Sequence, residues 1–583
     1  MSKRIATFIH NKCILEVDHD ISRICSINDV LRSPVFLRVV QRFVAFLKRE
    51  NSYLLDIFND GQNKTISSVI ANLQILATGP IPERLSPSAS LLFDFMEELY
   101  TFWLSLERFL VLHSKNHYSQ ESKTVLKANM RHLEKMVIET YRLIQKNITC
   151  ENLRIERETN AGIQVGLVTK NQKWLIPDRP YMMLGSIPMI RRIVLKPPLI
   201  LNPPTNKRFG RNQEVLTNPL EGLEINSNEW LCYPAKVGPL TILVFFHPVF
   251  MELGCSLINL FDLASYQDIK KKPDAIVLFG VPDNHLEEKY SILPTVYYHD
   301  QENDIFVGAV SAHLQFGYFG FLKKMVLTLH NLIMIKRNRL PFHGMMAQIT
   351  LSNNRKVNLL VIGDTGTGKS ETLEALRQVD KRMIRRLTII ADDMGSIEID
   401  KHSGKLRGYG TETGAFVRLN DMRPEYAFGQ MNRAIIISPQ EVNARLLIPV
   451  TTLTHVIAGY EIDYLLYANN YSLVDYEQTI IERLSNPDDA LFVFARGSAM
   501  SKGTTTSVGI THVYFANPFG AIQERARHQA IAKQVFETAF ATGVFVGELR
   551  TRLGIAGLEQ TGPEAAAKAL LELFYQEEIV TEK

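Results

Sequence analysis

The chain has 583 residues, of which 46% are hydrophobic and 22% are charged, and its formal net charge is only +4. This length predicts two or three domains, and this hydrophobic content supports buried cores and excludes a globally disordered chain. The small net charge argues against nucleic acid as the main partner, because proteins that bind nucleic acid usually concentrate basic charge.

The cysteines predict a reducing compartment. They are odd in number, scattered and without a CxxC pair, so neither a disulfide framework nor a zinc site is indicated: Cys13, Cys25, Cys150, Cys232 and Cys255. The first twenty residues lack the uninterrupted apolar segment of a secretory signal. We therefore expect a cytoplasmic protein.

The most apolar run, "LTILVFFHPVFMELGCSLINLF" at 240–261, is interrupted by His247, Pro248 and Glu252. A buried strand followed by a helix explains this pattern better than a membrane span does. The sequence therefore predicts a soluble protein with no membrane partner.

Residues 1–150 are predicted to form a helical domain. Between 33 and 50, apolar residues recur on one helical face: Phe36, Val39, Val40, Phe43 and Leu47. The segments 88–113 and 124–145 repeat this periodicity, and their aromatic residues are expected in a helix-bundle core. No chemistry is indicated, so a regulatory, docking or oligomerisation role with a protein partner is the expectation.

Residues 151–310 are predicted to form a mixed α/β domain. Short β-rich runs at 161–169, 241–247 and 274–282 alternate with proline-rich connections such as "LKPPLILNPPTNKR". The arginines and lysines of this domain are expected on a solvated surface, with the binding of an anionic substrate as the alternative. From residue 311 strands and helices alternate until a final helix that begins near Thr561 and Pro563.

The stretch "GDTGTGKS", 363–370, matches the phosphate-binding pattern G-x-x-x-x-G-K-[ST]. It follows an apolar strand at 357–362 and precedes a helical pattern at 370–379, so backbone N–H groups and a helix N-terminus should face phosphates. Lys369 would neutralise phosphate charge, and Ser370 would ligate Mg²⁺. The predicted ATP-binding residues are Gly363, Thr365, Gly366, Thr367, Gly368, Lys369 and Ser370.

A second apolar strand, "RLTIIA", ends in Asp392 and Asp393. Paired carboxylates after such a strand are suited to holding the metal of a nucleotide. The sequence therefore predicts that both aspartates bind Mg²⁺ beside the phosphate loop.

These motifs resemble two related families. "GDTGTGKSETLEAL" followed by "IADD", with the His343–Gly344 pair upstream, is similar to HPr kinase/phosphorylase. The wider region, about 315–550, resembles ATP-type phosphoenolpyruvate carboxykinase, which shares that nucleotide-binding fold. The similar segments are "GYFGFLKKMVLTLHNLIMIKRNRLPFH", "GYGTETGAFVRLNDMRPEYAF", "EVNARLLIPV" and, more loosely, "SKGTTTSVGITHVYFANPFG". The resemblance implies an α/β chain whose residues 311–583 form a carboxykinase-like P-loop catalytic domain.

By this resemblance Lys324, His343 and Asp393 would correspond to the ligands of a transition metal, usually Mn²⁺. Lys323 would be a companion lysine, and Arg445 would steady the transferring phosphoryl group. A lysine can ligate a metal only when it is neutral, so the pKa of Lys324 should be lowered by burial and by nearby cations.

Two chemistries remain open at this point. A carboxykinase phosphorylates an enolate formed by decarboxylation, so it needs no general base. A kinase of hydroxyl groups often uses a carboxylate near the acceptor, and HPr kinases use the aspartate at the position of Asp364. Asp364 could equally be a turn-forming residue. Conversion of oxaloacetate and ATP to phosphoenolpyruvate, ADP and CO₂ is the lead hypothesis. A kinase of a protein serine or a small hydroxyl compound is the alternative, and a nucleotide-binding regulatory protein is a third.

Overall fold

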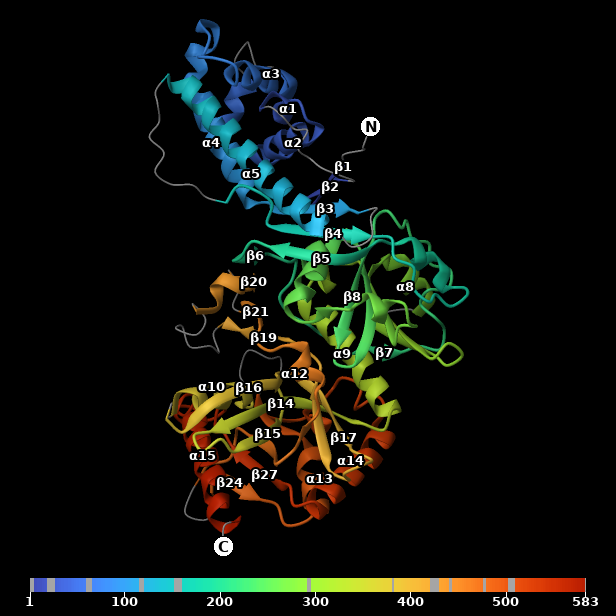
Figure 1. Ribbon diagram of the computed structural model, residues 1–583. Helices are drawn as coiled ribbons and strands as arrows, with labels where there is room; N and C mark the ends of the chain where they lie inside the picture. The colour runs from blue at the N-terminus through green and yellow to red at the C-terminus, as the bar shows by residue number, and fades with distance from the viewer. Residues whose placement is uncertain are drawn as a thin grey trace. The chain divides into compact units, whose positions relative to one another are not determined.

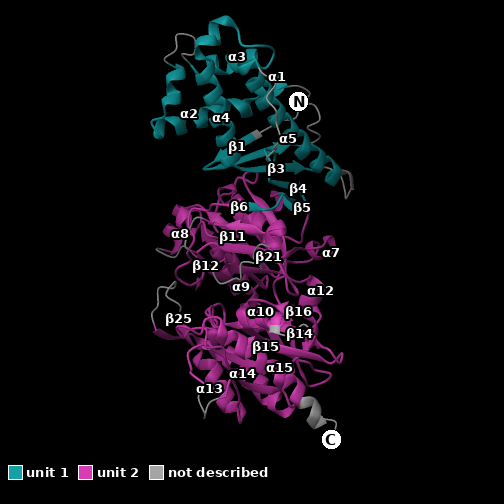
Figure 2. Ribbon diagram, turned by 90° about the vertical axis from the view of Figure 1, so that its left-hand side faces the viewer, with its two compact units in different colours: residues 1–172, 188–199 teal, residues 173–187, 200–583 magenta. Residues whose placement is uncertain are grey.

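The chain folds into two compact units, which Figure 2 shows in different colours. Unit 1 comprises residues 1–172 and 188–199, and unit 2 comprises residues 173–187 and 200–583. The computed structural model describes residues 5–17, 27–58, 65–114, 120–150, 160–290, 295–379, 382–419, 429–439, 443–474, 479–501 and 509–581. The finer division predicted at residues 150 and 310 stays a prediction.

Unit 1 combines a sheet with helices. Its strands follow the order β1-β2-β3-β4-β5, in which β2, β3 and β4 are parallel and the two outer pairs are antiparallel. The elements are β1 (Ile5–Ile9), β2 (Lys12–Val17), α1 (Ile27–Leu31), α2 (Pro34–Arg49), α3 (Ile66–Leu76), α4 (Ala89–Ser105), β3 (Glu107–His113), α5 (Gln120–Thr149), β4 (Val165–Lys170) and β5 (Met189–Leu195).

The predicted amphipathic helices are confirmed as α2, α4 and α5 (Figure 1). Ser33 caps α2 by accepting a hydrogen bond from the Phe36 N–H, and Pro34 occupies the first helical position. Phe43 of α2 and Phe95 of α4 meet edge to face in the helical core, with ring centroids 5.1 Å apart. The aromatic residues therefore belong to the core, as expected.

One helical prediction in unit 1 is wrong. The segment 88–113 was expected to be helical throughout, but α4 ends at Ser105 and residues 107–113 form strand β3. Phe109, Leu110, Val111 and Leu112 are all buried. Such a short continuous apolar run suits a strand that is covered on both faces, whereas a surface helix would alternate apolar and polar faces.

The first part of unit 2 contains a mixed sheet in the order β8-β9-β11-β13-β12-β7, with β10 paired to β8. The strand predicted at 241–247 is confirmed as β9, and short helical turns follow it as expected. The elements are β7 (Gln213–Glu214), β8 (Leu231–Val237), β9 (Leu240–Phe246), α6 (Met251–Ser256), β10 (Asp262–Leu263), α7 (Tyr266–Ile269), β11 (Ala275–Val281), α8 (Asp283–Tyr290), β12 (Thr295–Asp300), β13 (Ile305–Ser311) and α9 (Phe319–Lys336).

The second part of unit 2 contains a larger mixed sheet in the order β22-β18-β17-β14-β15-β23-β27-β24, with β16 also paired to β14. Strands β15, β23 and β27 are parallel, and β14 is antiparallel to β15. The strands are β14 (Leu340–Leu351), β15 (Lys356–Ile362), β16 (Ile384–Ala391), β17 (Met394–Ile399), β18 (Leu406–Gly410), β22 (Tyr460–Glu461), β23 (Tyr464–Asn469), β24 (Ile481–Arg483) and β27 (Phe545–Arg550).

Helices cover both faces of this larger sheet. One core contains residues of α10 (Lys369–Val379) and α15 (Thr561–Thr581), and another contains residues of α13 (Pro487–Arg496) and α14 (Arg525–Ala541). The remaining elements are α12 (Leu453–Ile457), the small sheet of β19 (Gly414–Arg418), β20 (Ile435–Ile437) and β21 (Arg445–Pro449), the hairpin of β25 (Ser498–Ser501) and β26 (Gly509–His512), and β6 (Leu199–Leu201). The chain is thus a mixed α/β protein, as predicted.

Within the described ranges, no helix combines the length and the apolar character that crossing a membrane requires. The run at 240–261, the most apolar in the sequence, is a strand followed by short helical turns.

Candidate functional site

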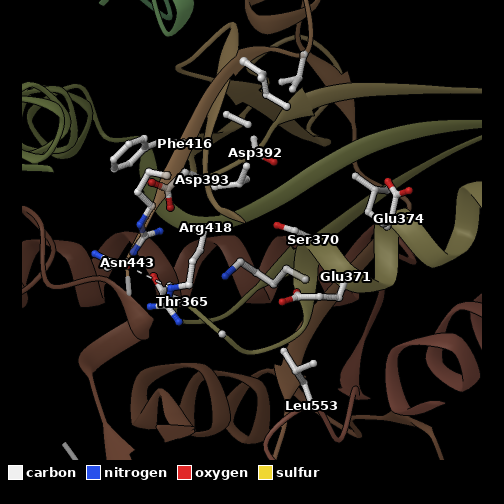
Figure 3. Close-up of a pocket in the computed structure, with 18 of the residues that line it drawn as sticks. Thr365, Ser370, Glu371, Glu374, Asp392, Asp393, Phe416, Arg418, Asn443 and Leu553 are labelled. Carbon is white, nitrogen blue, oxygen red and sulfur yellow. Dashed lines mark hydrogen bonds between the residues drawn. The ribbon is translucent and has the colours of Figure 1, made fainter. Parts of the chain in front are cut away.

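A cavity of about 860 Å³ in unit 2 brings together most of the predicted site residues (Figure 3). Its walls come from the first turns of α9 and α10, the loop between β15 and α10, the end of β16, strands β19 and β21, and the segment that leads into α15. The predicted residues on its walls are Lys323, Lys324, Thr365, Gly366, Lys369, Ser370, Asp392, Asp393 and Arg445.

The loop 363–370 needs its glycines for physical reasons. Gly366 and Gly368 have φ angles of 79° and 89°, in the region that side chains disfavour. A Cβ atom at Gly363 would lie 2.6 Å from the Thr367 hydroxyl, so the chain also passes too closely there for a side chain. The glycine pattern read from the sequence therefore corresponds to real backbone constraints.

The loop is held by residues that follow the neighbouring parallel strands. Asn470, after β23, donates a 3.0 Å hydrogen bond to the Gly366 carbonyl, and Thr551, after β27, donates a 2.6 Å bond to the Thr367 carbonyl. The loop thus lies at the carboxyl ends of three parallel strands, where open α/β sheets usually bind ligands. It leads into the N-terminus of α10, and the first N–H groups of a helix suit an anion.

Lys369 is buried, and its ammonium group donates to the Gly363 and Asp364 carbonyls at 2.8 and 2.7 Å. Burial lowers its pKa, although the charges of Asp393 and Asp364 oppose the shift. A cation held at this point can neutralise an anionic group in the cavity. Ser370, the next residue, is exposed on the cavity wall.

Three basic side chains converge on Asp393. Lys323 and Lys324 lie 2.7 and 2.8 Å from its Oδ2 atom, and the Nε2 atom of His343 lies 2.8 Å from Oδ1. The lysines come from the first turns of α9 and His343 from β14, whereas Asp393 follows β16. Lys324 and His343 precede Asp393 by 69 and 50 positions in the sequence, yet the three side chains form one cluster.

The charges of this cluster depend on one another. Burial by itself lowers the pKa of Lys323, but the attraction of Asp393 and Glu412 outweighs it and raises the pKa above the ordinary value. For Lys324, burial and the charge of Lys323 prevail and lower the pKa. Burial would raise the pKa of Asp393, but the two lysines and His343 hold it well below its usual range. The two adjacent lysines therefore differ in basicity.

Asp392 differs from its neighbour. Burial, reinforced by the charges of Asp393 and Glu412, raises the pKa of Asp392 to about 7, although Lys323 opposes the shift. Glu412 is itself buried, and it lies 3.2 Å from the Lys323 ammonium and accepts a hydrogen bond from the Thr411 hydroxyl. No role was assigned to Glu412 from the sequence. A glutamate in a segment rich in glycine and threonine gives no local sign that it is buried.

The surroundings of His343 favour a cation between it and Asp393. Nδ1 of His343 lies 2.6 Å from the Ala516 carbonyl, which can only accept, so Nδ1 carries a hydrogen. Nε2 faces the Asp393 carboxylate at 2.8 Å. In a neutral imidazole two acceptors would face each other there, so either a proton or a metal ion belongs between them.

The donor set suits a transition metal. An imidazole nitrogen, a carboxylate and an amine with a lowered pKa are ligands of borderline metals such as Mn²⁺, and His343, Asp393 and Lys324 supply them. In the described part of the chain, no group of three or more histidine, cysteine, aspartate and glutamate side chains could hold a metal. The predicted ligands are His343, Asp393 and Lys324, of which only the first two are of those types. The metal at this position therefore stays a prediction.

Two aromatic rings lie beside the cations of the cavity, which include Arg208 besides the predicted Lys323, Lys324 and Arg445. Arg208 and Lys324 lie over the same ring, Phe519, at 4.9 and 4.6 Å from its centroid, and Lys323 and Arg445 lie over Phe416 at 5.8 and 5.4 Å. The Nε atom of Arg445 is buried without a hydrogen-bond partner in the described residues.

Arg418 and Asn443 lie across the cavity from Glu371 and Glu374 of α10 (Figure 3). The Arg418 guanidinium donates to the Asn443 side chain at 3.2 Å. Lys207 is exposed, as expected, and both it and the half-buried Arg208 line the cavity, where an anionic ligand would meet them. The basic run "KRFGR" at 207–211 was the available signal for them.

Asp364 is not among the residues of the cavity wall. Its Oδ1 atom accepts a 2.7 Å hydrogen bond from the Thr365 N–H and lies 3.8 Å from Nδ1 of His343. The Asp364 carbonyl also accepts from the Thr367 hydroxyl at 2.7 Å. The Asp364 carbonyl also accepts from the Thr367 N–H at 3.2 Å, so Asp364 opens a β-turn.

No family model matches this chain, and no curated protein matches its sequence. The geometry and charges of the cavity residues are therefore the basis on which a function can be assigned.

Proposed function

We propose that unit 2 is an ATP-dependent phosphotransferase with a carboxykinase-like P-loop site, and that it converts oxaloacetate and ATP to phosphoenolpyruvate, ADP and CO₂. The observation that carries the proposal is the convergence of Lys323, Lys324 and the buried His343 on Asp393, which lies on the wall of the cavity that Thr365, Gly366 and Lys369 also line. The resemblance of residues 315–550 to ATP-type phosphoenolpyruvate carboxykinase agrees with this reaction.

The nucleotide phosphates would lie along the loop. The N–H groups at the start of α10 and the Lys369 ammonium would bind the terminal phosphates, and both line or open onto the cavity. Ser370 and the carboxylates after β16 would hold the Mg²⁺ of the nucleotide. These residues provide the usual parts of phosphoryl transfer, which depends on positioning and on neutralised charge.

The acceptor would lie near the second cluster. Decarboxylation breaks a C–C bond of oxaloacetate and leaves an enolate, whose oxygen bonds to the terminal phosphorus while ADP departs. Lys323, Arg445 and Arg208 supply positive charge on that side of the cavity, so they can bind the carboxylates of oxaloacetate and stabilise the enolate. A transition metal held by Lys324, His343 and Asp393 would supply Lewis-acid stabilisation of the developing oxyanion.

The cations of the cavity favour an enolate acceptor over a neutral hydroxyl acceptor. Lys323, Arg445 and Arg208 line the wall and suit an anionic acceptor. A hydroxyl acceptor would need a general base that reaches its proton. Asp364 is the candidate for that role, and one of its carboxylate oxygens accepts from the Thr365 N–H at 2.7 Å.

The decisive experiment is incubation of the full chain with ATP, Mg²⁺, Mn²⁺ and oxaloacetate. We expect CO₂ release with stoichiometric phosphoenolpyruvate and ADP. Lys324→Ala should abolish product, whereas Lys336→Ala should not, because Lys336 lies at the far end of the same helix and pairs with Asp304 outside the cavity. ATP binding without turnover of oxaloacetate would eliminate the carboxykinase reaction.

A second variant separates the two chemistries. Asp364→Asn should leave phosphoenolpyruvate formation within about threefold of the original, since loss of a turn-forming carboxylate alters little. For a hydroxyl kinase the same change should reduce turnover by about 10²–10⁴-fold. A screen with labelled ATP against serine, inositol and candidate proteins would reveal that activity, and binding of ATP with no acceptor at all would support the regulatory hypothesis instead.

A further inference from the structure

Unit 1 contains a cavity of its own, of about 570 Å³, between helices α2, α4 and α5 and strands β1 and β2. We infer that it is a binding site for an amphipathic small molecule whose apolar body fills the cavity and whose polar end reaches solvent. This inference is independent of the function proposed for unit 2.

The deep wall of the cavity is apolar. Val39 of α2, Met96 and Leu99 of α4, and Met136 of α5 line it and are each at most 5% exposed. The rings of Tyr100 and Tyr141, which also line it, stack with centroids 3.9 Å apart and planes 9° apart. These side chains offer hydrocarbon and ring surface, against which a chain or a flat ring gains binding energy by leaving water.

Three polar groups that line the cavity are already bonded within the protein. The Trp103 indole N–H donates to the Ala161 carbonyl, the Thr140 hydroxyl to the Met136 carbonyl and the Tyr141 hydroxyl to Glu97, each at 2.7 Å. A polar ligand would lose its hydrogen bonds to water there without replacing them, and that loss is costly. The body of the ligand must therefore be apolar.

Charged residues line only the more accessible part. Arg38 is exposed and donates to the Ala6 carbonyl, and Glu16 is half-buried and lies 3.3 Å from His113. A polar head group placed beside them keeps its contact with water. The volume lies in the range of pockets that hold drug-sized molecules, and a macromolecular interface would instead need a patch of about 800 Å² on this unit.

The test uses the full chain and two straight-chain primary alcohols that differ only in length. N-phenyl-1-naphthylamine, an uncharged probe that fluoresces in apolar surroundings, should bind, and 1-dodecanol should displace it. 1-Octanol should be at least about 100-fold weaker, because each buried methylene contributes about 0.8 kcal/mol. Equal displacement by the two alcohols would contradict an enclosed apolar site.

Two substitutions on the same helix locate the site. Val137 and Ile138 of α5 are both half-buried, but only Val137 lines the cavity. Val137→Trp should fill the cavity and reduce probe affinity at least tenfold, whereas Ile138→Trp should not. Circular dichroism would show whether each variant folds. If Val137→Trp does not fold, Leu133→Phe replaces it, because Leu133 also lines the cavity.

Hydrogen exchange locates the bound alcohol independently of the substitutions. Saturating 1-dodecanol should slow exchange in α2, α4 and α5 of the original chain. Slowed exchange confined to unit 2, or the same probe affinity in Val137→Trp and Ile138→Trp, would overturn the proposal.

Discussion

The two cavities of this chain differ in how their walls are stabilised. In unit 2 the wall is built of charged groups that satisfy one another, with Lys323, Lys324 and His343 grouped around Asp393. In unit 1 the deep wall is mostly hydrocarbon and aromatic ring, and the polar groups of Trp103, Thr140 and Tyr141 on it are bonded to the protein. The charges of the unit 2 cavity are shielded from water, so they act strongly on a ligand. The unit 1 cavity offers apolar surface on which a ligand can be buried.

This difference has a consequence for stability. A buried cluster of opposite charges tolerates the loss of one member poorly, because the remaining charges stay buried without compensation. An apolar cavity tolerates a larger side chain better, because the added atoms occupy empty space. Substitutions in unit 2 should therefore alter stability and activity together, and substitutions in the unit 1 cavity should alter ligand binding with less effect on stability.

The largest effect is expected from Asp393→Asn. It leaves the Lys324 ammonium buried without its carboxylate and leaves Lys323 with Glu412 alone, so unit 2 should lose about 3–5 kcal/mol of unfolding free energy. Hydrogen exchange followed peptide by peptide would show the loss in unit 2 and not in unit 1.

The matched control is Asp392→Asn, for which the sign should be opposite. The pKa of Asp392 is about 7 in the folded protein against an ordinary value of 3.8, so the folded state disfavours its ionised form. Above about pH 7 the original carries that cost and the asparagine variant does not, so the variant should be at least as stable. Equal destabilisation by both substitutions would refute the charge assignment.

The second largest effect is expected from Lys369→Met. Removal of this ammonium should reduce phosphoryl transfer by about 10²–10³-fold, since it is a positioned donor to developing charge. Turnover with saturating ATP and oxaloacetate measures the loss. Binding of N-phenyl-1-naphthylamine to unit 1 should be unchanged, and a parallel loss of probe binding would mean that the variant had misfolded rather than lost a site residue.

Acid should weaken unit 2 through buried histidines. Burial lowers the pKa of His330 and of His528 to about 4 from 6.5. A histidine that is neutral when folded but protonates when unfolded contributes full stability above about pH 6.5, and the contribution falls with pH until about 4, by at most roughly 3 kcal/mol per residue. Urea unfolding at several pH values measures the slope.

His528→Gln should flatten that slope, because glutamine cannot titrate and can still donate to the Pro341 carbonyl as His528 does. Unit 1 has no histidine with a comparable shift in its described residues, so its exchange rates should respond less to this pH range. An unchanged slope in His528→Gln would assign the acid sensitivity to other groups.

The smallest effect concerns the turn that holds His343. Phe515 and Ala516 both have φ angles of 52°, a conformation that costs roughly 1–2 kcal/mol for a residue with a side chain. Ala516→Gly should therefore stabilise unit 2 by about 1 kcal/mol, measured by thermal unfolding. Phe515→Gly should destabilise it, because the Phe515 ring is buried in the core.

The local elements of the fold were predictable. Periodicity identified helices α2 and α5 of unit 1, and the strand and helix on either side of the glycine loop in unit 2. These elements depend on residues that are close together in sequence. The segment 107–113 was assigned wrongly because a buried strand and a buried helical turn share the same apolar composition. Only its neighbours, β2 and β4, settle that it is a strand.

The composition of the cavity was less predictable. The pairing of Glu412 with Lys323 and the place of Arg208 and Arg418 on the cavity wall do not follow from their neighbours in sequence. Asp364 fits both a base and a turn former in sequence, and the contact with the Thr365 N–H supports the turn.

The sequence by itself therefore determined the phosphate-binding pattern, its strand and helix, and the paired aspartates, since backbone geometry and helix periodicity follow from nearby residues. The tertiary structure alone decided which charges meet. Lys324 and Asp393 are 69 residues apart, and whether the ammonium of one is neutralised by the carboxylate of the other depends on the packing of α9 against the larger sheet. Electrostatic interactions act over distance in space, and the sequence order does not record that distance.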